Sequence, residues 1–293
     1  MISKRGAEFR CYMNLMALDS LPQSSSGPRG AAFPETLAAI RAAGYDGVQF
    51  ASRATPEQLT ECRAQRMGMA ASGRINDPRE ALPLAEQMAA DGYECVTVHV
   101  GWGLEDDTDA AGLIESILDA SVRARFPIYI ETHRATIFQD MWRTVGFLKR
   151  FPEVRINGDF SHWYTGQEMV YGGFEKKLAF IRPVLERVRF LHGRIGSPGC
   201  IQVRVELDER EEPVYVRHFR QLWSACFRAF LEAAQPRERV YFAPELLAPQ
   251  IFYARTFASS QGIPVEESDR WEQSLVLKRI AEASFEEASS SYE

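Results

Sequence analysis

The sequence lacks the features that mark several large classes of protein. Its 293 residues contain no run of roughly 18 apolar residues, the length that a membrane-spanning helix needs. The amino terminus, MISKRGAEFR, has no apolar core of the secretory type. No G-x-G-x-x-G or P-loop motif follows a predicted strand, so nothing indicates nucleotide binding of those types. We therefore expect a cytoplasmic protein with no membrane partner.

Cysteine and positive charge are also scarce. The five cysteines are odd in number and no two form a C-x-x-C pair, which argues against a disulfide framework and against a thiolate zinc site. They are Cys11, Cys62, Cys95, Cys200 and Cys226. The net charge is −6 and the sequence pI is about 5.6, so we expect no nucleic-acid binding through a general basic field.

What is present is an alternation of short apolar runs with longer amphipathic ones. Hydrophobic residues make up 45% of the chain and charged residues 25%, as in soluble globular proteins. Strands are predicted at 9–17, 46–51, 68–75, 95–101, 126–133, 154–160, 189–195 and 239–246. Helices are predicted at 34–43, 55–67, 77–92, 109–125, 137–152, 174–188 with a kink or break at Pro183, and 214–235.

Strands that alternate with helices favour a parallel sheet, and eight such units at this length point to a (β/α)₈ TIM barrel. A doubly wound open sheet is the alternative. No change of composition marks a linker, so we expect a single domain over residues 1–293. The barrel should occupy about 9–255. Residues 256–293 should form a C-terminal extension, under the barrel or against a partner chain, with the polar tail SFEEASSSYE frayed.

Polar side chains fall where the predicted strands end, which is where barrel enzymes carry their chemistry. Strand four ends at His99, strand five at Glu131 with His133 beyond it, and strand six at Asp159 with His162 beyond it; strand seven ends at His192 with Arg194 beyond it, and strand eight at Glu245. Only one of the five histidines, His218, is predicted to lie in a helix. Residues two apart share a face of a strand, so Glu131 and His133 should both point into the mouth.

Four of these residues make a candidate metal site: Glu131, Asp159, His192 and Glu245. Three carboxylates at one mouth repel one another unless a cation neutralises them, and a divalent ion is the simplest one. The mostly oxygen donor set suits Mn²⁺, Mg²⁺, Co²⁺ or Fe²⁺ better than a thiolate-type zinc site. Zinc, which also binds histidine and carboxylate, stays among the alternatives.

Each residue taken alone also has a structural interpretation. A strand-end carboxylate is usually a helix cap or an ion-pair partner. His99 is more often a core histidine, His133 and Arg134 suit loop hydrogen bonds, and Arg194 suits a carboxylate clamp. Trp102 and Trp163 are of a type that packs loops, and His218 should be structural. The joint pattern over consecutive strands is what favours a functional site.

That ordered set resembles a known family. Glu131, Asp159-x-x-His162, His192-x-Arg194 and Glu245, with GYDGVQF on strand two, resemble the xylose isomerase-like TIM barrels over about residues 10–250. Within them, the pattern is similar to the sugar phosphate isomerase/epimerase group, which includes ketose 3-epimerases, hydroxypyruvate isomerase and inosose dehydratase.

The resemblance implies a role for each matching position. The four candidate ligands would hold one divalent ion, commonly Mn²⁺, and Glu131 and Glu245 would face each other across the substrate as the acid/base pair. His162 and Arg194 would bind the carbonyl end of the substrate. We add His99, Trp102 and Arg134 as further candidates for substrate binding. Members of the group are often dimers or tetramers, so a homodimer or homotetramer is expected.

This chain departs from the family pattern in three places. The loop after strand five, THRATIFQD, offers His133 and Arg134 where the epimerases usually carry a further glutamate. Strand two ends in Gln49 where many relatives have glutamate. The loop SPGCIQVRVELDEREEP after strand seven is long and charged. These departures keep the metal set but leave the substrate and the reaction open.

Four functions follow from these patterns. The first is a metal-dependent isomerase or epimerase of a sugar or related polyol, working through proton abstraction next to a carbonyl and a metal-stabilised enediolate. The second is a lyase on a keto-sugar or keto-inositol, with His133 as an essential acid/base. A hydrolase of the endonuclease IV type and a non-enzymatic metal- or sugar-binding protein are the remaining two. The acidic charge and the few histidines argue against the hydrolase.

Overall fold

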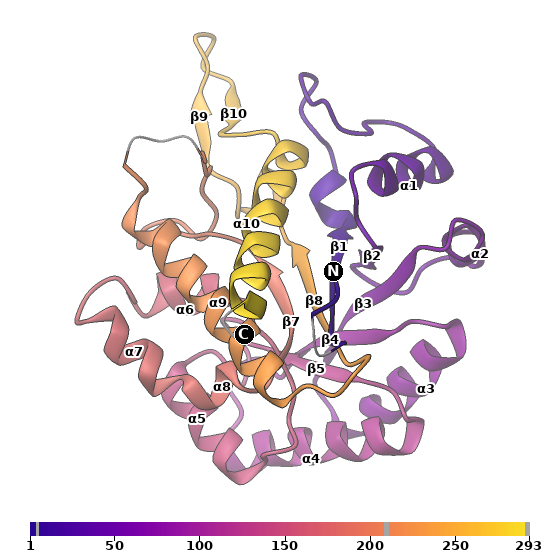
Figure 1. Cartoon of the computed structure of the whole chain (residues 1–293), viewed down its shortest axis with the longest axis vertical. Helices are drawn as coiled ribbons and strands as arrows, with labels where there is room; N and C mark the ends of the chain where they lie inside the picture. Colours follow the sequence, from indigo (N-terminus) through magenta and orange to yellow (C-terminus); the bar gives the residue numbers. More distant parts are fainter. Residues whose placement is uncertain (4–5, 208–210, 291–293) are drawn as a thin grey trace.

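The eight predicted strands close into one parallel barrel. The computed structural model describes residues 1–3, 6–207 and 211–290, and in it β1 to β8 follow one another around the barrel in chain order, with β8 pairing with β1 (Figure 1). The barrel strands are β1 (Glu8–Asn14), β2 (Gly47–Phe50), β3 (Gly68–Ile75), β4 (Cys95–Val100), β5 (Ile128–Glu131), β6 (Ile156–Asn157), β7 (Val188–Gly193) and β8 (Arg239–Pro244). The predicted (β/α)₈ barrel is therefore confirmed, and the open-sheet alternative is wrong.

Helices cover the outside of the barrel (Figure 1). They are α1 (Phe33–Ala42), α2 (Pro56–Ala64), α3 (Ala81–Asp91), α4 (Asp107–Ala124), α5 (Met141–Arg150), α6 (Phe160–Gly166), α7 (Phe174–Phe180), α8 (Arg182–Leu185), α9 (Val214–Ala233) and α10 (Arg270–Ser290). Local signals set several ends: Thr55 and Gln58 form a capping box at the start of α2, and Gly92 ends α3 at a φ of 84°. The break predicted at Pro183 is confirmed, because α7 ends before it and α8 begins at Arg182.

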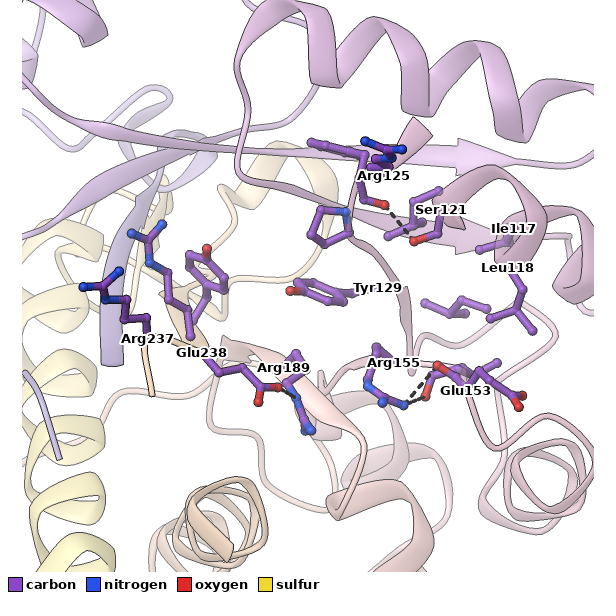
Figure 2. Close-up of a pocket in the computed structure, with 17 residues that line it drawn as sticks. Ile117, Leu118, Ser121, Arg125, Tyr129, Glu153, Arg155, Arg189, Arg237 and Glu238 are labelled. Atoms are coloured by element: carbon purple, nitrogen blue, oxygen red, sulfur yellow. Dashed lines mark hydrogen bonds and ion pairs between the residues drawn. The ribbon is translucent and has the colours of Figure 1, made fainter. Parts of the chain in front are cut away.

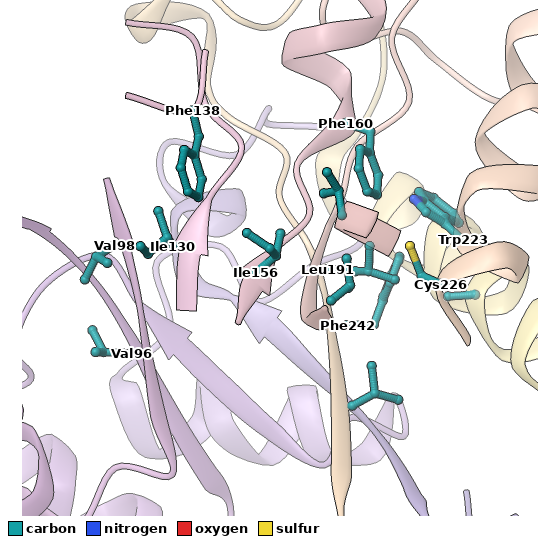
Figure 3. Packing of buried hydrophobic residues seen from close by; sticks show 14 of the residues in the cluster. Val96, Val98, Ile130, Phe138, Ile156, Phe160, Leu191, Trp223, Cys226 and Phe242 are labelled. Carbon is teal, nitrogen blue, oxygen red and sulfur yellow. The ribbon is translucent and has the colours of Figure 1, made fainter. Parts of the chain in front are cut away.

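The hydrophobic core fills the layer between the strands and the helices. Trp223 and Cys226 of α9 lie against Leu191 of β7 and Phe242 of β8 (Figure 3). The Trp223 and Phe242 rings meet edge to face, with centroids 5.0 Å apart. This packing fixes β7 and β8 relative to α9, so the ends of these strands are held by a rigid layer.

Strand six differs from its prediction. The expected strand 154–160 is only Ile156–Asn157, and α6 begins at Phe160. Asp159 is the N-cap of α6, and its side chain accepts a hydrogen bond from the Ser161 amide. The prediction that only His218 lies in a helix is therefore wrong, since His162 sits in α6. Aspartate is a favoured N-cap residue, and the helix that begins after Asp159 ends the strand early.

The tail also differs from its prediction, because residues 270–290 form a long helix, α10, instead of a frayed end. Residues 291–293 of the predicted tail lie outside the described residues. Phe285 of α10 packs on Phe9 of β1 and Phe227 of α9, with ring centroids 5.2 and 5.6 Å apart. Arg270 is buried and donates to the Ala17 and Asp19 carbonyls, each at 2.7 Å. The extension thus supplies the helix that covers β8 and β1.

A two-stranded antiparallel hairpin precedes α10. It consists of β9 (Thr256–Ala258) and β10 (Pro264–Glu266) and projects from the body of the molecule (Figure 1). In the described part of the chain, every helix is too short or too polar to cross a membrane.

The packing of α10 yields a stability prediction. Phe285→Ala should lower the free energy of unfolding by about 3–5 kcal/mol, because it removes a buried ring between two other rings. Urea denaturation measures this change. Glu286→Ala, at an exposed neighbour on the same helix, is the control and should stay within about 0.5 kcal/mol of the wild type. If the free energy of unfolding of Phe285→Ala changed as little as that of Glu286→Ala, α10 would not contribute to the core.

Candidate metal centre at the carboxyl ends of the strands

The four predicted ligands meet in one buried cluster. One ligand atom from each of Glu131, Asp159, His192 and Glu245 lies within 4.8 Å of the others. They come from the ends of β5, β6, β7 and β8, which are neighbours in the barrel. His192 Nδ1 is 3.3 Å from both Glu131 Oε2 and Glu245 Oε1. The barrel thus gathers residues separated by more than a hundred positions in the sequence.

The cluster fits a divalent cation on two observations. The Glu131 Oε1 atom is buried and meets no hydrogen-bond donor in good geometry among the described residues, although His99 Nε2 lies 3.3 Å away. The other ring nitrogen of His192, Nε2, lies 2.9 Å from Gln49 Nε2 and 3.1 Å from Gln49 Oε1. If the oxygen accepts its proton, Nδ1 keeps a lone pair that faces Glu131, Glu245 and the Asn157 amide, the last at 3.1 Å. A group of three carboxylates and one imidazole is a donor set that divalent metals use.

Arg194 contributes fixed positive charge to the same cluster. Its Nη2 contacts Asp159 Oδ2 and lies 3.0 Å from Glu245 Oε2, and its Nε donates to Ser161 Oγ at 3.0 Å. All these groups are buried. The carboxylate clamp that was one interpretation of Arg194 is therefore what the structure shows. His162 Nε2 lies 3.3 Å from Asp159 Oδ2 and 3.3 Å from Arg194 Nη2.

The electrostatics of the two glutamates differ. Burial would raise the pKa of Glu131, but His192 and His99 lower it well below its usual value. Burial raises the pKa of Glu245, and the opposing effects of His192 and Arg194 do not cancel this. The pKa of Asp159 is lowered, because Arg194 and His162 outweigh the effect of burial. The charges of the cluster therefore keep Glu131 and Asp159 ionised although both are buried.

Three histidines form a stack at the side of the cluster. The His133 ring lies between those of His99 and His162, with centroids 4.0 and 3.8 Å away. Burial and the neighbouring His162 lower the pKa of His133 to about 3, so its imidazole is neutral at physiological pH. Its Nε2 is 3.3 Å from the Tyr253 hydroxyl. Glu131 and His133 thus lie on the same side of the barrel mouth, as alternation along the strand predicted.

A cavity of about 840 Å³ opens above the cluster, a volume typical of small-molecule sites. Glu131, Glu245, His99, His133 and Arg194 all line it. So do Tyr253 and Arg74, which the sequence analysis missed. Arg74 stands near the end of β3, where the strand-end rule would have found it, whereas nothing in the sequence places Tyr253 at the mouth.

The remaining predicted residues lie at the edge of the cavity or elsewhere. Trp102 is 56% exposed and stacks on the Arg74 guanidinium. Arg134 is exposed and lies over the Tyr253 ring, 4.8 Å from its centroid. Trp163 is buried and donates to the Phe138 carbonyl, so it packs a loop. His218, near the start of α9, contacts the Tyr164 hydroxyl at 2.8 Å and stacks on Phe174, and it is absent from the lining of the cavity.

Amides that the sequence analysis did not assign complete the site. Asn157 Nδ2 donates to Glu131 Oε2 at 3.0 Å, and Asn14 Nδ2 lies 3.1 Å from Gln49 Oε1. Gln49 Nε2 also donates to Ser72 and Thr97, at 3.1 and 3.2 Å. Gln49, which stands where many relatives of the resembled family have glutamate, therefore orients His192.

The opposite end of the barrel has a different character. A cavity of about 500 Å³ lies there, between α4 and the first residues of β5, β7 and β8 (Figure 2). Arginines dominate its polar lining: Arg125, Arg155, Arg189, Arg237 and Arg239. The groups of metal-binding side chains found among the described residues all lie at the mouth instead. The candidate metal ligands therefore lie at the carboxyl ends of the strands, the end at which barrel enzymes carry their sites.

A second trio at the mouth, His99, Glu131 and His133, also brings ligand atoms within 4.8 Å of one another. Arg74 Nη2 lies 3.2 Å from His99 Nδ1 and so places a positive charge beside this trio. The trio offers one carboxylate where the four-residue cluster offers three, so the cluster is the better site for a divalent cation.

The sequence matches no family model and no curated protein. Its structure is similar to several solved ones. A D-tagatose 3-epimerase-like protein is 10% identical with a TM-score of 0.57, and a xylose isomerase-like TIM barrel protein from Mycobacterium smegmatis in complex with magnesium is 12% identical with a TM-score of 0.56. Each match covers 97% of this chain and 100% of the other.

A third similar structure is a probable 3-DHS dehydratase from Bacillus anthracis, 13% identical, with a TM-score of 0.55 over 82% of this chain and 93% of the other. Likeness at such low identity establishes the fold. The chain has the TIM-barrel fold of these structures, and the resemblance seen in the sequence is confirmed at the level of the fold.

The double role of Asp159 yields a prediction on metal binding. Asp159→Asn keeps an N-cap for α6 but removes a charge, so bound divalent metal should fall at least tenfold while the barrel stays folded. Asp159→Ala should lose the metal and also about 1 kcal/mol or more of stability. Metal analysis after Mn²⁺ loading and gel filtration, with thermal melts, measures both. Full metal content in Asp159→Asn would remove Asp159 from the ligand set.

Proposed function

We propose that the protein is a divalent-metal-dependent isomerase or epimerase of a sugar or related polyol. It would act by removing a proton from a carbon next to a carbonyl. The observation that carries the proposal is the buried cluster in which Glu131 and Glu245 flank His192, each 3.3 Å from its Nδ1, on the floor of a cavity suited to a small molecule. Two carboxylates across a small site can remove a proton and return it.

A metal ion held by Glu131, Asp159, His192 and Glu245 would act as a Lewis acid that stabilises negative charge developing on oxygen. We take Mn²⁺ as the first candidate because the family resemblance and the oxygen-rich donor set favour it. The residues of the chain supply the rest. Arg194 and His162 stand beside Asp159 and can orient a carbonyl oxygen by hydrogen bonds.

The walls of the site keep the reaction away from bulk water. Glu131, Asp159, His192 and Arg194 are each at most 1% exposed, and Tyr253 lies over Arg194 at 4.7 Å from its ring centroid. Electrostatic interactions are stronger in such a site than in water. The carboxylates therefore act on the substrate in surroundings that the protein has already organised.

A second candidate is a lyase that removes water from a keto-sugar or keto-inositol, and His133 is the observation that favours it. The imidazole lines the cavity, is neutral, and stands beside Glu131 on one side of the mouth. A lyase needs a base for the proton on carbon and an acid for the leaving hydroxyl group; the neutral His133 can be the base, and Glu245, whose pKa is raised, can be the acid. An isomerase or epimerase that uses Glu131 and Glu245 needs neither role from His133.

The test is deuterium exchange in metal-reconstituted protein. Mn²⁺-loaded enzyme in D₂O is incubated with a panel of ketoses and keto-inositols and followed by NMR. We expect deuterium at a carbon next to the carbonyl, abolished in Glu131→Gln. Epimers or aldose–ketose pairs as products support the isomerase or epimerase. A product that has lost the elements of water supports the lyase. No exchange with any compound, despite one bound metal per chain, would contradict both candidates.

The role of His133 is tested in the same assay. If His133 is an acid/base of a lyase, His133→Asn should lower turnover by about 10²-fold or more. In an isomerase or epimerase that uses Glu131 and Glu245, the loss should stay below about tenfold. His218→Asn is the matched control, because it changes a histidine of α9 that does not line the cavity, and it should keep wild-type exchange.

A further inference from the structure

The cavity holds one arginine that the metal cluster does not use. Three arginines line it: Arg53, Arg74 and Arg194. Arg53 pairs with Asp91 at 2.6 Å, and Arg194 pairs with Asp159 and Glu245. Arg74 has no carboxylate oxygen within 4.0 Å in the part of the chain that the structure describes. Of the three arginines that line the cavity, Arg74 is therefore the one without an ion pair to a described carboxylate.

Arg74 is held in place by neutral groups. Its Nη1 donates to the Gly101 carbonyl at 2.7 Å, and its Nη2 lies 3.2 Å from His99 Nδ1. The Trp102 ring covers the guanidinium, with the Cζ atom 4.0 Å from the ring centroid. A guanidinium has five N–H donors, so these contacts leave three for another partner. The side chain is therefore positioned and still able to bind.

The pairing of the barrel strands places Arg74 at the same level of the mouth as the metal cluster. Arg74 pairs in register with His99 on β4, and the adjacent Val98 pairs with Ile130, the residue before Glu131 on β5. His99 Nε2 reaches Glu131 Oε1 at 3.3 Å. Two strand spacings separate β3 from β5, about 10 Å between backbones. One small molecule can therefore touch both Arg74 and the cluster.

The charges of the mouth show what Arg74 is suited to bind. Glu131, Asp159 and Glu245 carry three negative charges, which Arg194 and one divalent ion would balance. Arg74 is outside this balance, and no carboxylate of the described residues is in ion-pair contact with it, although Glu131 and Glu105 act on it from farther away. Partial loss of water lowers its pKa from the usual value, despite the opposing effects of Glu131 and Glu105. A buried or half-buried cation without a counter-ion is costly unless a ligand supplies one.

We propose that the substrate of this site carries an anionic group, a carboxylate or a phosphate, that binds Arg74 while the rest of the molecule lies over the metal cluster. This rests on the proposed function, since it assumes that the cavity binds the substrate. A planar guanidinium with free donors is the side chain best suited to such oxygens. A neutral sugar would leave Arg74 without a counter-charge.

The experiment compares ligands that differ in charge. Mn²⁺-loaded protein is titrated with fructose, fructose 6-phosphate and 5-keto-gluconate, with dissociation constants taken from ligand NMR. We expect at least one anionic compound to bind about tenfold tighter than fructose or better, the scale of a charge-assisted hydrogen bond. The two anionic arms separate phosphate from carboxylate. Equal affinity for all three compounds would overturn the proposal.

Variants then assign the preference to Arg74. Arg74→Met should lower the ratio of the affinity for the anionic compound to the affinity for fructose about tenfold, and Arg74→Lys should restore part of that ratio. Arg79→Met is the control, because Arg79 is an exposed arginine paired with Asp77. If Arg74→Met fails to fold, Arg74→Gln, which can still donate to the Gly101 carbonyl, replaces it. An advantage that survives in the folded variant would come from the metal and would contradict the assignment.

Turnover separates this proposal from the proposed function. For any compound that shows deuterium exchange, Arg74→Met should raise the KM of the anionic substrate at least tenfold and change kcat much less. A fall in kcat for neutral and anionic substrates alike would indicate a structural role and overturn the proposal. An anion preference that depends on Arg74 but comes with no exchange would support the binding site and contradict the isomerase.

Discussion

Three buried carboxylates at one end of the barrel determine how the rest of the mouth is built. An ionised carboxylate taken out of water is stable only if charges and hydrogen bonds replace its hydration. Arg194 contacts Asp159 and Glu245, and the Asn157 amide donates to Glu131. These partners replace part of the lost hydration. A divalent ion would complete the balance, which is the physical reason that these residues suit a metal centre.

The half of the barrel without carboxylates supports the half that has them. Gln49 of β2 reaches across to His192 Nε2, and Asn14, Ser72 and Thr97 hold the Gln49 amide in turn. Hydrogen bonds of this kind set which ring nitrogen of a histidine is free to bind a metal. Gln49 is a neutral support for His192 and adds no negative charge to the cluster.

The mouth is therefore divided by charge. Acidic groups gather at the ends of β5 to β8, while Arg74 near the end of β3 adds a cation with no acidic partner among the described residues. His99 stands between the two halves and contacts both Arg74 and Glu131. A substrate lying across this division would meet a metal at one side and a guanidinium at the other. Such a gradient can orient a small molecule before any bond changes.

Periodicity and strand-end position in the sequence were sufficient for the barrel and for Glu131, Asp159, His192 and Glu245 as one group, because parallel strands bring their carboxyl ends together whatever lies between them. They were insufficient for α6 and α10. A capping aspartate ended strand six early, and the amphipathic pattern of α10 is weak, so its place was decided by Phe285 packing between Phe9 and Phe227. Only the tertiary structure brought Tyr253 and Arg74 to the same cavity and Gln49 to His192. Their roles depend on distances across the barrel, which no local pattern encodes.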